Sequence, residues 1–336
     1  YLRSSNRNKK APHKMTNKPE EINKAFSRSI PQLQTAWDST SLGILKTCPR
    51  KYYYSMIENW VPQGESIHLT FGIHFHKALE LYDKALALGG NHEAGTHAAV
   101  TYIQTLGTRD DSGAWTPWDT DRMHKDYGIK NRYTLLRAVL WYLEKFNDDP
   151  ARTLILENGK PAVELSFRLG IGTEAADGSE YFLCGHLDRV VEFGPDVWVT
   201  DRKTTKSALA DYYFNQYTPN NQITLYSLAG RVISQRTVKG VIMDAAQLLV
   251  GGARFARKLV YRTQAQLDEW LRDAINYFRL AERYADAEYW PQNDTACDKF
   301  GGCHFREICG ADPSVRDLYL KSKFDKRMWD PLDSRE

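Results

Sequence analysis

Residues 185–190 read Gly-His-Leu-Asp-Arg-Val, and residues 200–204 read Thr-Asp-Arg-Lys-Thr. Hydrophobic alternation predicts a strand at each place, and alternate residues of a strand share a face. Asp201 and Lys203 should therefore project to the same side, with Asp188 delivered beside them by the preceding strand. Two converging carboxylates favour a hard divalent cation, and a neighbouring lysine can steady negative charge or help to deprotonate a water.

The bulk composition is compatible with a large folded core. The chain has 336 residues, of which 42% are hydrophobic and 26% charged, with a formal net charge of +3. No run is long and apolar enough for a membrane span, and no secretory segment opens the chain, so we expect a cytoplasmic protein without membrane contact. The weak positive charge neither requires nor excludes a nucleic-acid partner.

Patterning along the chain predicts an α/β protein, with a β-sheet core inside a helical envelope. Residues 1–30 are polar and basic and read as a flexible tail. We expect one domain over residues 31–310, with a helical insertion at about 89–150, followed by a tail over 311–336. Helical periodicity falls on residues 71–88, 129–146, 222–234 and 263–287, and Asp38-Ser39-Thr40-Ser41 predicts a further helix start. Strand-like alternation falls on residues 161–169, 183–193, 197–203 and 238–250.

Further polar side chains accompany the two aspartates in chain order. They are His76, Glu164, Gln222 and Tyr226. Each alone has an ordinary interpretation, such as a surface histidine or a helix-surface pair one turn apart. Their order and spacing together favour one composite site.

These segments resemble the RecB-like branch of the PD-(D/E)XK nuclease superfamily. The matching stretches are residues 41–54 (SLGILKTCPRKYYY), 72–80 (GIHFHKALE), 185–191 (GHLDRVV), 200–206 (TDRKTTK) and 222–226 (QITLY). They span roughly residues 38–310. The resemblance implies a restriction-endonuclease-like core, in which helices flank a mixed central sheet.

The resemblance also implies roles for individual residues. A Mg²⁺ or Mn²⁺ ion would be bound by His76, Asp188, Asp201 and the backbone carbonyl of Arg202. Lys203 would orient or deprotonate the attacking water, and we expect the cation to depress the pKa of this lysine. Gln222 and Tyr226 would place the scissile strand and Lys203, with Glu164 as a supporting carboxylate.

Three of the five cysteines fall within thirteen residues, which favours a metal site over unrelated buried thiols. They are Cys297, Cys303 and Cys309; Cys48 lies far upstream, and Cys184 reads as a buried thiol. Iron–sulfur members of the resembled branch, the AddB-type subunits and CRISPR-adaptation exonucleases, share the layout of one cysteine before the core and three after it. The first gap here is five residues instead of their usual two. The four thiolates would hold a [4Fe–4S] cluster or, alternatively, a structural Zn²⁺.

Basic and aromatic residues near these motifs are candidates for contact with a DNA backbone. They are Arg50, Lys51, Tyr52, Lys206, Arg254 and Arg257. No base-reading helix and no phosphate-binding motor motif is evident, so we expect neither sequence-specific cutting nor an intrinsic motor.

The expected activity is metal-dependent hydrolysis of DNA, by an exonuclease acting on ends or single strands. The setting would be DNA repair, recombination, phage DNA processing or CRISPR adaptation, with a helicase or a recombination or adaptation protein as a possible partner. The alternatives are a non-catalytic DNA-binding subunit of a helicase–nuclease complex and a structure-specific endonuclease. The oligomeric state is not indicated by the sequence.

Overall fold

The structure is a computed structural model of the whole chain. It describes residues 23–64, 66–109, 113, 115–118, 130–249 and 251–332. Residues 1–22 of the predicted N-terminal tail lie outside the described residues. Within the described ranges, no helix combines the length and apolar character needed to cross a membrane.

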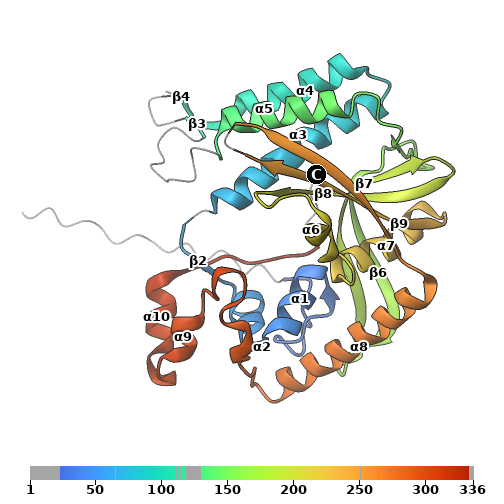
Figure 1. Cartoon of the computed structure of the whole chain (residues 1–336). Coiled ribbons are helices and arrows are strands. Elements are labelled where there is room, and N and C mark those ends of the chain that lie inside the picture. Colours follow the sequence, from blue (N-terminus) through green and yellow to red (C-terminus); the bar gives the residue numbers. More distant parts are fainter. Residues whose placement is uncertain are drawn as a thin grey trace, which may run out of the picture.

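A seven-stranded mixed sheet forms the centre of the molecule (Figure 1). Its main path runs β1-β7-β8-β9-β10, and β5 and β6 also pair with β7. The strands are β1 (Ala36–Trp37), β5 (Arg152–Thr153), β6 (Val163–Glu174), β7 (Glu180–Phe193), β8 (Asp196–Thr205), β9 (Val238–Leu248) and β10 (Ala253–Tyr261). This confirms the predicted α/β class with a mixed central sheet.

The hairpin of β7 and β8 opens into a fork. The two strands pair antiparallel from Phe193–Asp196 as far as Arg189–Thr200. Beyond that point β8 keeps pairing in parallel with β9 up to Thr205. The crossover from β8 to β9 passes through the helices α6 (Asp211–Asn215) and α7 (Asn221–Ser234). Because the strands part just after Arg189–Thr200, Asp188 and Asp201 stand at the mouth of the fork.

One group of helices builds the larger core against the sheet. It comprises α1 (Ser39–Thr47), α2 (Pro49–Tyr52), α7 and α8 (Gln264–Asp286). Asp38 caps α1 through the backbone N–H of Ser41, which is the start that the sequence predicts. Within this core Trp37 stacks between Tyr52 and Phe278, with ring centroids 5.6 and 4.8 Å away. Such aromatic packing removes a large apolar area from water.

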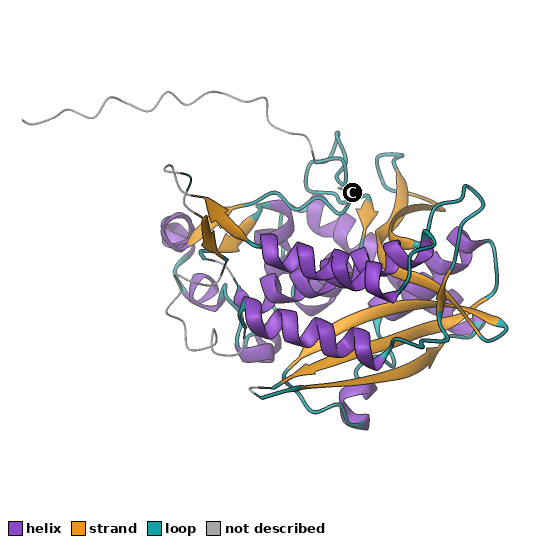
Figure 2. Ribbon diagram, turned by 90° about the horizontal axis from the view of Figure 1, so that it is seen from above, coloured by secondary structure: helices purple, strands orange, loops and turns teal. Residues whose placement is uncertain are grey.

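A second group of helices builds a smaller core over the end of β9. It comprises α3 (Ile67–Ala87), α4 (His92–Thr105) and α5 (Arg132–Lys145), which Figure 2 shows lying alongside the sheet. Phe71, Phe75 and Leu79 of α3 are buried in it, as their helical spacing predicts. The helix α3 thereby lies beside β8, where the fork opens.

The C-terminal segment folds back onto the region that follows α2. A π-helical turn (Tyr53–Ile57) leads into β2 (Trp60–Pro62), which pairs with β11 (Phe324–Lys326). Phe305 stacks on Phe324 at 4.8 Å beside the helices α9 (Arg306–Gly310) and α10 (Arg316–Lys323). Much of the predicted tail 311–336 is therefore helix and paired strand, a difference caused by packing against distant residues. The strands β3 (Gly107–Arg109) and β4 (Trp115–Pro117) form a separate pair.

Candidate active site

The two aspartates meet at the mouth of the fork. Asp188 precedes Arg189 on β7 and Asp201 follows Thr200 on β8, so in the antiparallel register they would form the next cross-strand pair. The backbone N–H of Arg202 donates to Asp188 Oδ2 at 2.8 Å, which ties the two branches together. Lys203 Nζ lies 2.9 Å from Asp201 Oδ1 and 2.8 Å from Asp201 Oδ2. Asp201 and Lys203 thus share a face, as strand alternation predicts.

His76 reaches the fork from α3. Its Nδ1 lies 3.4 Å from Asp188 Oδ2, and 28% of the side chain is exposed. The helix approaches β8 closely at Gly72, where an added Cβ would lie 3.6 Å from Thr204 Oγ1. The structure therefore brings together His76, Asp188 and Asp201, which are 125 sequence positions apart at their extremes.

Burial and charge act differently on the two carboxyl groups. Burial raises the pKa of Asp188, but His76, Lys203 and the N–H of Arg202 lower it more, so that the net shift is downward. Burial is the largest influence on Asp201 and raises its pKa; attraction to Lys203 lowers this pKa, repulsion from Asp188 raises it, and the net shift is upward. Asp201 is only 1% exposed. Ionisation of both Asp188 and Asp201 is therefore opposed by burial, and a bound cation would favour it.

The pKa of Lys203 differs from the sequence-based expectation. Burial lowers this pKa, but the carboxylates of Asp201 and Asp188 raise it more, and the net shift is upward. This upward shift comes from the protein groups alone, whereas the predicted depression is that of a lysine beside a bound cation, and it stays a prediction.

The donor set suits a hard divalent cation. Asp201 Oδ2 is buried and accepts no hydrogen bond among the described residues, although the ammonium of Lys203 lies beside it. In an extended strand the N–H and C=O of one residue point to the same side. Since the N–H of Arg202 points to Asp188, its carbonyl also faces the fork. Carboxylate and carbonyl oxygens with one imidazole fit Mg²⁺ or Mn²⁺.

The predicted cation ligands do not converge on a single metal position in this structure. Within the described part of the chain, no three His, Cys, Asp or Glu side chains form a complete metal-binding group. In the structure, the ammonium of Lys203 supplies the positive charge beside Asp201. The ligand roles of His76, Asp188, Asp201 and Arg202 therefore remain predictions that the geometry supports.

The helix α7 lines the other side of the fork. Gln222 Nε2 donates to the hydroxyl of Tyr226 at 3.1 Å, so the predicted pair is a real contact. Burial raises the pKa of Tyr226, and the negative charges of Asp201 and Asp188 raise it further. The helix packs on both β7 and β8, the strands that carry the two aspartates.

Tyr213 of α6 is a neighbour of the site that the sequence did not indicate. Burial and a hydrogen bond with Tyr217 raise its pKa, and Lys203 and Asp201 also act on it. No local pattern marks this tyrosine, because a five-residue helix carries too little periodicity to show which face is buried.

Glu164 lies across from the first aspartate. It falls between the pairs Val163–Arg189 and Leu165–Leu187, which puts it opposite Asp188. Its φ of 51° is in the left-handed region, which is costly for a non-glycine residue. Its role as a supporting carboxylate remains a prediction.

The predicted DNA contacts divide into two groups. Lys206 and Arg254 are exposed, and Arg50 and Lys51 are half-buried. Arg50 Nε donates to the carbonyl of Trp290 at 2.5 Å, so part of this guanidinium is already used within the fold. These four residues remain candidates for contact with DNA.

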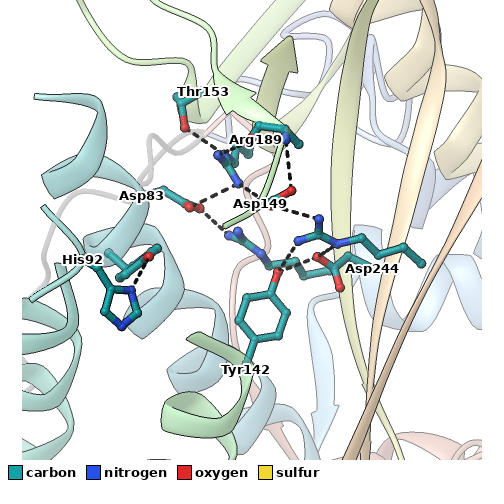
Figure 3. Close-up of polar contacts among 11 residues, drawn as sticks. Asp83, His92, Tyr142, Asp149, Thr153, Arg189 and Asp244 are labelled. Carbon is teal, nitrogen blue, oxygen red and sulfur yellow. Dashed lines mark hydrogen bonds and ion pairs between the residues drawn. The ribbon is translucent and has the colours of Figure 1, made fainter. Parts of the chain in front are cut away.

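Tyr52 and Arg257 do not fit that role. Tyr52 is 0% exposed and its hydroxyl donates to Gln34 Oε1 at 2.6 Å. The half-buried Arg257 is held by Asp244 at 2.8 Å and Asp149 at 2.9 Å, two aspartates that Figure 3 labels. Tyr52 is buried in the core and Arg257 is already neutralised by two carboxylates, so the prediction that they contact DNA is wrong. The reason is that sequence gives the charge of a residue but not the partner that neutralises it.

The four cysteines of the predicted staple border one small pocket. Cys48 comes from the α1–α2 junction, and the others come from the C-terminal segment: Cys297, Cys303 and Cys309. The backbone N–H of Cys303 donates to the carbonyl of Cys297 at 2.8 Å, which draws two of them together. Cys184 lies elsewhere, fully buried beside Ala25 and Ala36, as expected for a structural thiol.

The small size of this pocket limits the ligand that it can hold without movement of the cysteines. Its volume is about 20 Å³. A space of that size takes one water or one small ion. A four-iron cluster would require the thiols to move apart, for which the half-buried Cys297 and Cys303 leave room at the surface.

Sequence comparison now defines the class of protein. The profile of the PD-(D/E)XK nuclease superfamily matches residues 39–310. The chain therefore belongs to the PD-(D/E)XK nuclease superfamily, whose members are metal-dependent nucleases.

Comparison with individual proteins adds two solved structures. One is a crystal structure named "Putative exonuclease" from Eubacterium rectale, with 12% identity, a TM-score of 0.43, and coverage of 88% of this chain and 96% of that chain. The other is a crystal structure of SSO0001, with 12% identity, a TM-score of 0.27, and coverage of 72% and 76%. No curated protein sequence matches this chain.

Proposed function

We propose that this chain is a Mg²⁺- or Mn²⁺-dependent deoxyribonuclease that hydrolyses phosphodiester bonds of DNA ends or single strands. The observation that carries the proposal is the fork between β7 and β8. It places Asp188, Asp201 and Lys203 together and sets His76 3.4 Å from the first aspartate. The exonuclease mode rests on the resemblance to the RecB-like branch.

The residues of the fork have distinct parts in the reaction. Asp188, Asp201, His76 and the carbonyl of Arg202 would hold the cation. When bound, a divalent cation acidifies a water and offsets charge on the phosphate oxygens. Lys203, paired with Asp201, would orient or deprotonate the attacking water and steady negative charge at the phosphate. Gln222 and Tyr226 would orient the strand and the lysine from α7.

A cleavage assay with end-labelled DNA tests this proposal. Purified protein would be incubated with 5′-labelled or 3′-labelled linear DNA and with circular single-stranded DNA, in Mn²⁺, Mg²⁺ or EDTA. We expect mononucleotides or short products from linear DNA, intact circles, and no products in EDTA. Lys203→Ala is the matched variant, and cleavage at the wild-type rate by that folded variant would sink the proposed site.

The same assay separates the alternative functions. Cleavage of circles would indicate a structure-specific endonuclease. Binding of DNA without cleavage in any metal would indicate a non-catalytic subunit of a helicase–nuclease complex. A helicase, recombination or adaptation partner, and a cytoplasmic setting, remain part of the proposal.

We also propose that the four cysteines hold a metal centre that ties the C-terminal segment to the α1–α2 junction. Support comes from their convergence on one pocket, although Cys48 lies 249 positions before Cys297, the first of the other three. A link across so long a loop would remove much conformational entropy from the unfolded chain. We propose a [4Fe–4S] cluster, with structural Zn²⁺ as the alternative.

Visible absorption and metal analysis of protein purified without oxygen distinguish these outcomes. A brown protein with about four irons indicates the cluster, and a colourless protein with one zinc indicates the alternative. Protein free of both metals, with melting unchanged by Cys303→Ser, would exclude a staple.

A further inference from the structure

A buried network of arginines and aspartates lies next to the fork (Figure 3). We call it the arginine–aspartate network. Its members are Asp83, Asp149, Asp244, Arg189, Arg202 and Arg257. Three carboxylates face three guanidinium groups, so the network is balanced in charge.

Asp83 joins both branches of the fork. Arg202 Nη1 lies 2.7 Å from Asp83 Oδ2, and Arg189 Nη1 lies 3.3 Å from Asp83 Oδ1. Arg202 follows the aspartate of β8 in sequence, and Arg189 follows the aspartate of β7. One carboxylate therefore pairs with the guanidinium group of the residue that follows each predicted aspartate ligand.

Asp83 also belongs to the helix that carries His76. The two residues are seven positions apart on α3, which is almost two full turns, so they lie on the same face of the helix. His76 contacts Asp188 at one point of that face, and Asp83 contacts both arginines at the other. This spacing fixes both the rotation and the axial position of α3 relative to the fork.

Stability alone does not account for charged groups at this place. Buried ion pairs often add little net stability compared with well-packed apolar side chains. Apolar packing is non-directional and would leave α3 free to slide or turn by small amounts. Two ion pairs from the two oxygens of one carboxylate define a direction as well as a distance.

We propose that Asp83 is a positioning residue of the metal site. By pairing with Arg189 and Arg202 it holds His76 at a fixed distance from Asp188 and Asp201. The inference rests on the proposed metal-dependent function. In it, the buried Asp83 sets the distances between the ligands that bind the metal.

Calorimetric titration of the purified full chain with Mn²⁺, without DNA, tests this role. The proteins are wild type, Asp83→Asn, His76→Ala and the double variant. We expect Asp83→Asn to weaken Mn²⁺ binding at least about tenfold, as is usual when a residue that orients a ligand is lost. In the His76→Ala background the same change should weaken binding less than twofold, because Asp83 acts through His76.

Asp244→Asn is the matched control. Asp244 is as deeply buried in the same network, but its side chain pairs with Arg257 and Tyr142 and not with a residue of α3. We expect its Mn²⁺ affinity to stay within twofold of wild type. Equal losses in Asp244→Asn and Asp83→Asn would show a general effect of destabilisation and overturn the inference.

Two further outcomes also decide the matter. Wild-type Mn²⁺ affinity in a folded Asp83→Asn protein overturns the positioning role. If that variant does not fold, Asp83→Glu keeps the charge and moves the carboxylate by one methylene, and wild-type affinity there overturns the role as well. Failure of the wild-type chain to bind Mn²⁺ would instead refute the proposed metal site itself.

Discussion

The fork and the arginine–aspartate network use adjacent residues of the same two strands, yet they differ in charge balance. At the fork, two carboxylates have as charged neighbours the ammonium of Lys203, 2.8 Å from Asp201, and the imidazole of His76, 3.4 Å from Asp188. In the network, every carboxylate has a guanidinium partner within 3.3 Å. The first arrangement leaves negative charge for a cation to neutralise, and the second leaves none.

The difference shows that one sheet carries two kinds of site: the fork, which is suited to bind a metal, and the network, which holds structural elements in place. A buried carboxylate with too few partners is costly by itself and gains most from binding a metal. A matched network gains nothing from an ion, but it resists movement of the elements that it joins. Substitutions in the two regions should therefore change different measurable quantities.

The largest effect should follow loss of the carboxylate at the fork. We expect Asp201→Asn to reduce DNA cleavage at least about 10³-fold, a loss of about 4 kcal/mol of transition-state stabilisation. The thermal midpoint should not fall, because the pKa of Asp201 is raised and ionisation of this group therefore opposes folding at neutral pH. Cleavage rates and calorimetric melting measure the two effects. A strong loss of stability in Asp201→Asn would contradict the proposed difference between the fork and the network.

A substitution in the network should give the opposite result. Asp244→Asn leaves Arg257 without its 2.8 Å partner in the interior. We expect a loss of about 3–5 kcal/mol in the free energy of unfolding, as is usual when one member of a buried pair is removed. Urea unfolding measures it. A folded variant with unchanged stability would show that the network is not needed for the fold.

Metal binding itself should stabilise the fork. Mn²⁺ at about 100 times its dissociation constant should raise the free energy of unfolding by about 2.7 kcal/mol. The gain should be absent in Asp201→Asn and retained, from a lower starting value, in Asp244→Asn. Thermal melts with and without Mn²⁺ provide the measurement, and an equal gain in Asp201→Asn would place the ion elsewhere.

The smallest effect concerns a charge that belongs to neither region. Lys130 is buried against the ring of Phe71 at 4.5 Å, and among the described residues it has no carboxylate partner. Burial lowers the pKa of Lys130 to about 8, from an ordinary 10.5. A lysine whose pKa is lower in the folded state opposes folding below that pKa, and the cost disappears as pH rises toward 10.5.

Lys130→Met should therefore be neutral or stabilising at pH 7, by about 1 kcal/mol after allowance for the lost cation–π contact. The advantage should vanish near pH 10. Unfolding free energies at the two pH values measure it. A variant that is less stable than wild type at pH 7 would show that the charge is well accommodated.

The sequence was most successful where the signal is local. Strand alternation was enough to place Asp201 and Lys203 on one face, and an N-terminal cap was enough to start α1 at Asp38. The assignment of Tyr52 and Arg257 to DNA binding failed, because their burial and partners depend on distant residues, such as Trp290 for Tyr52 and Asp149 for Arg257. Tyr213 and Asp83 gave no local signal at all.

By itself, the sequence determined the mixed α/β class, the order of the motifs and the identity of the carboxylates and lysine at the fork. These follow from residue type and from the two-residue period of a strand, which any short segment carries. Only the tertiary structure decided which charges are neutralised: Arg257 and Arg202 by interior aspartates, Asp201 by one shared lysine. The physical reason is that neutralisation depends on distances of a few ångströms between distant segments, and those distances exist only once the sheet has formed and α3 has packed beside it.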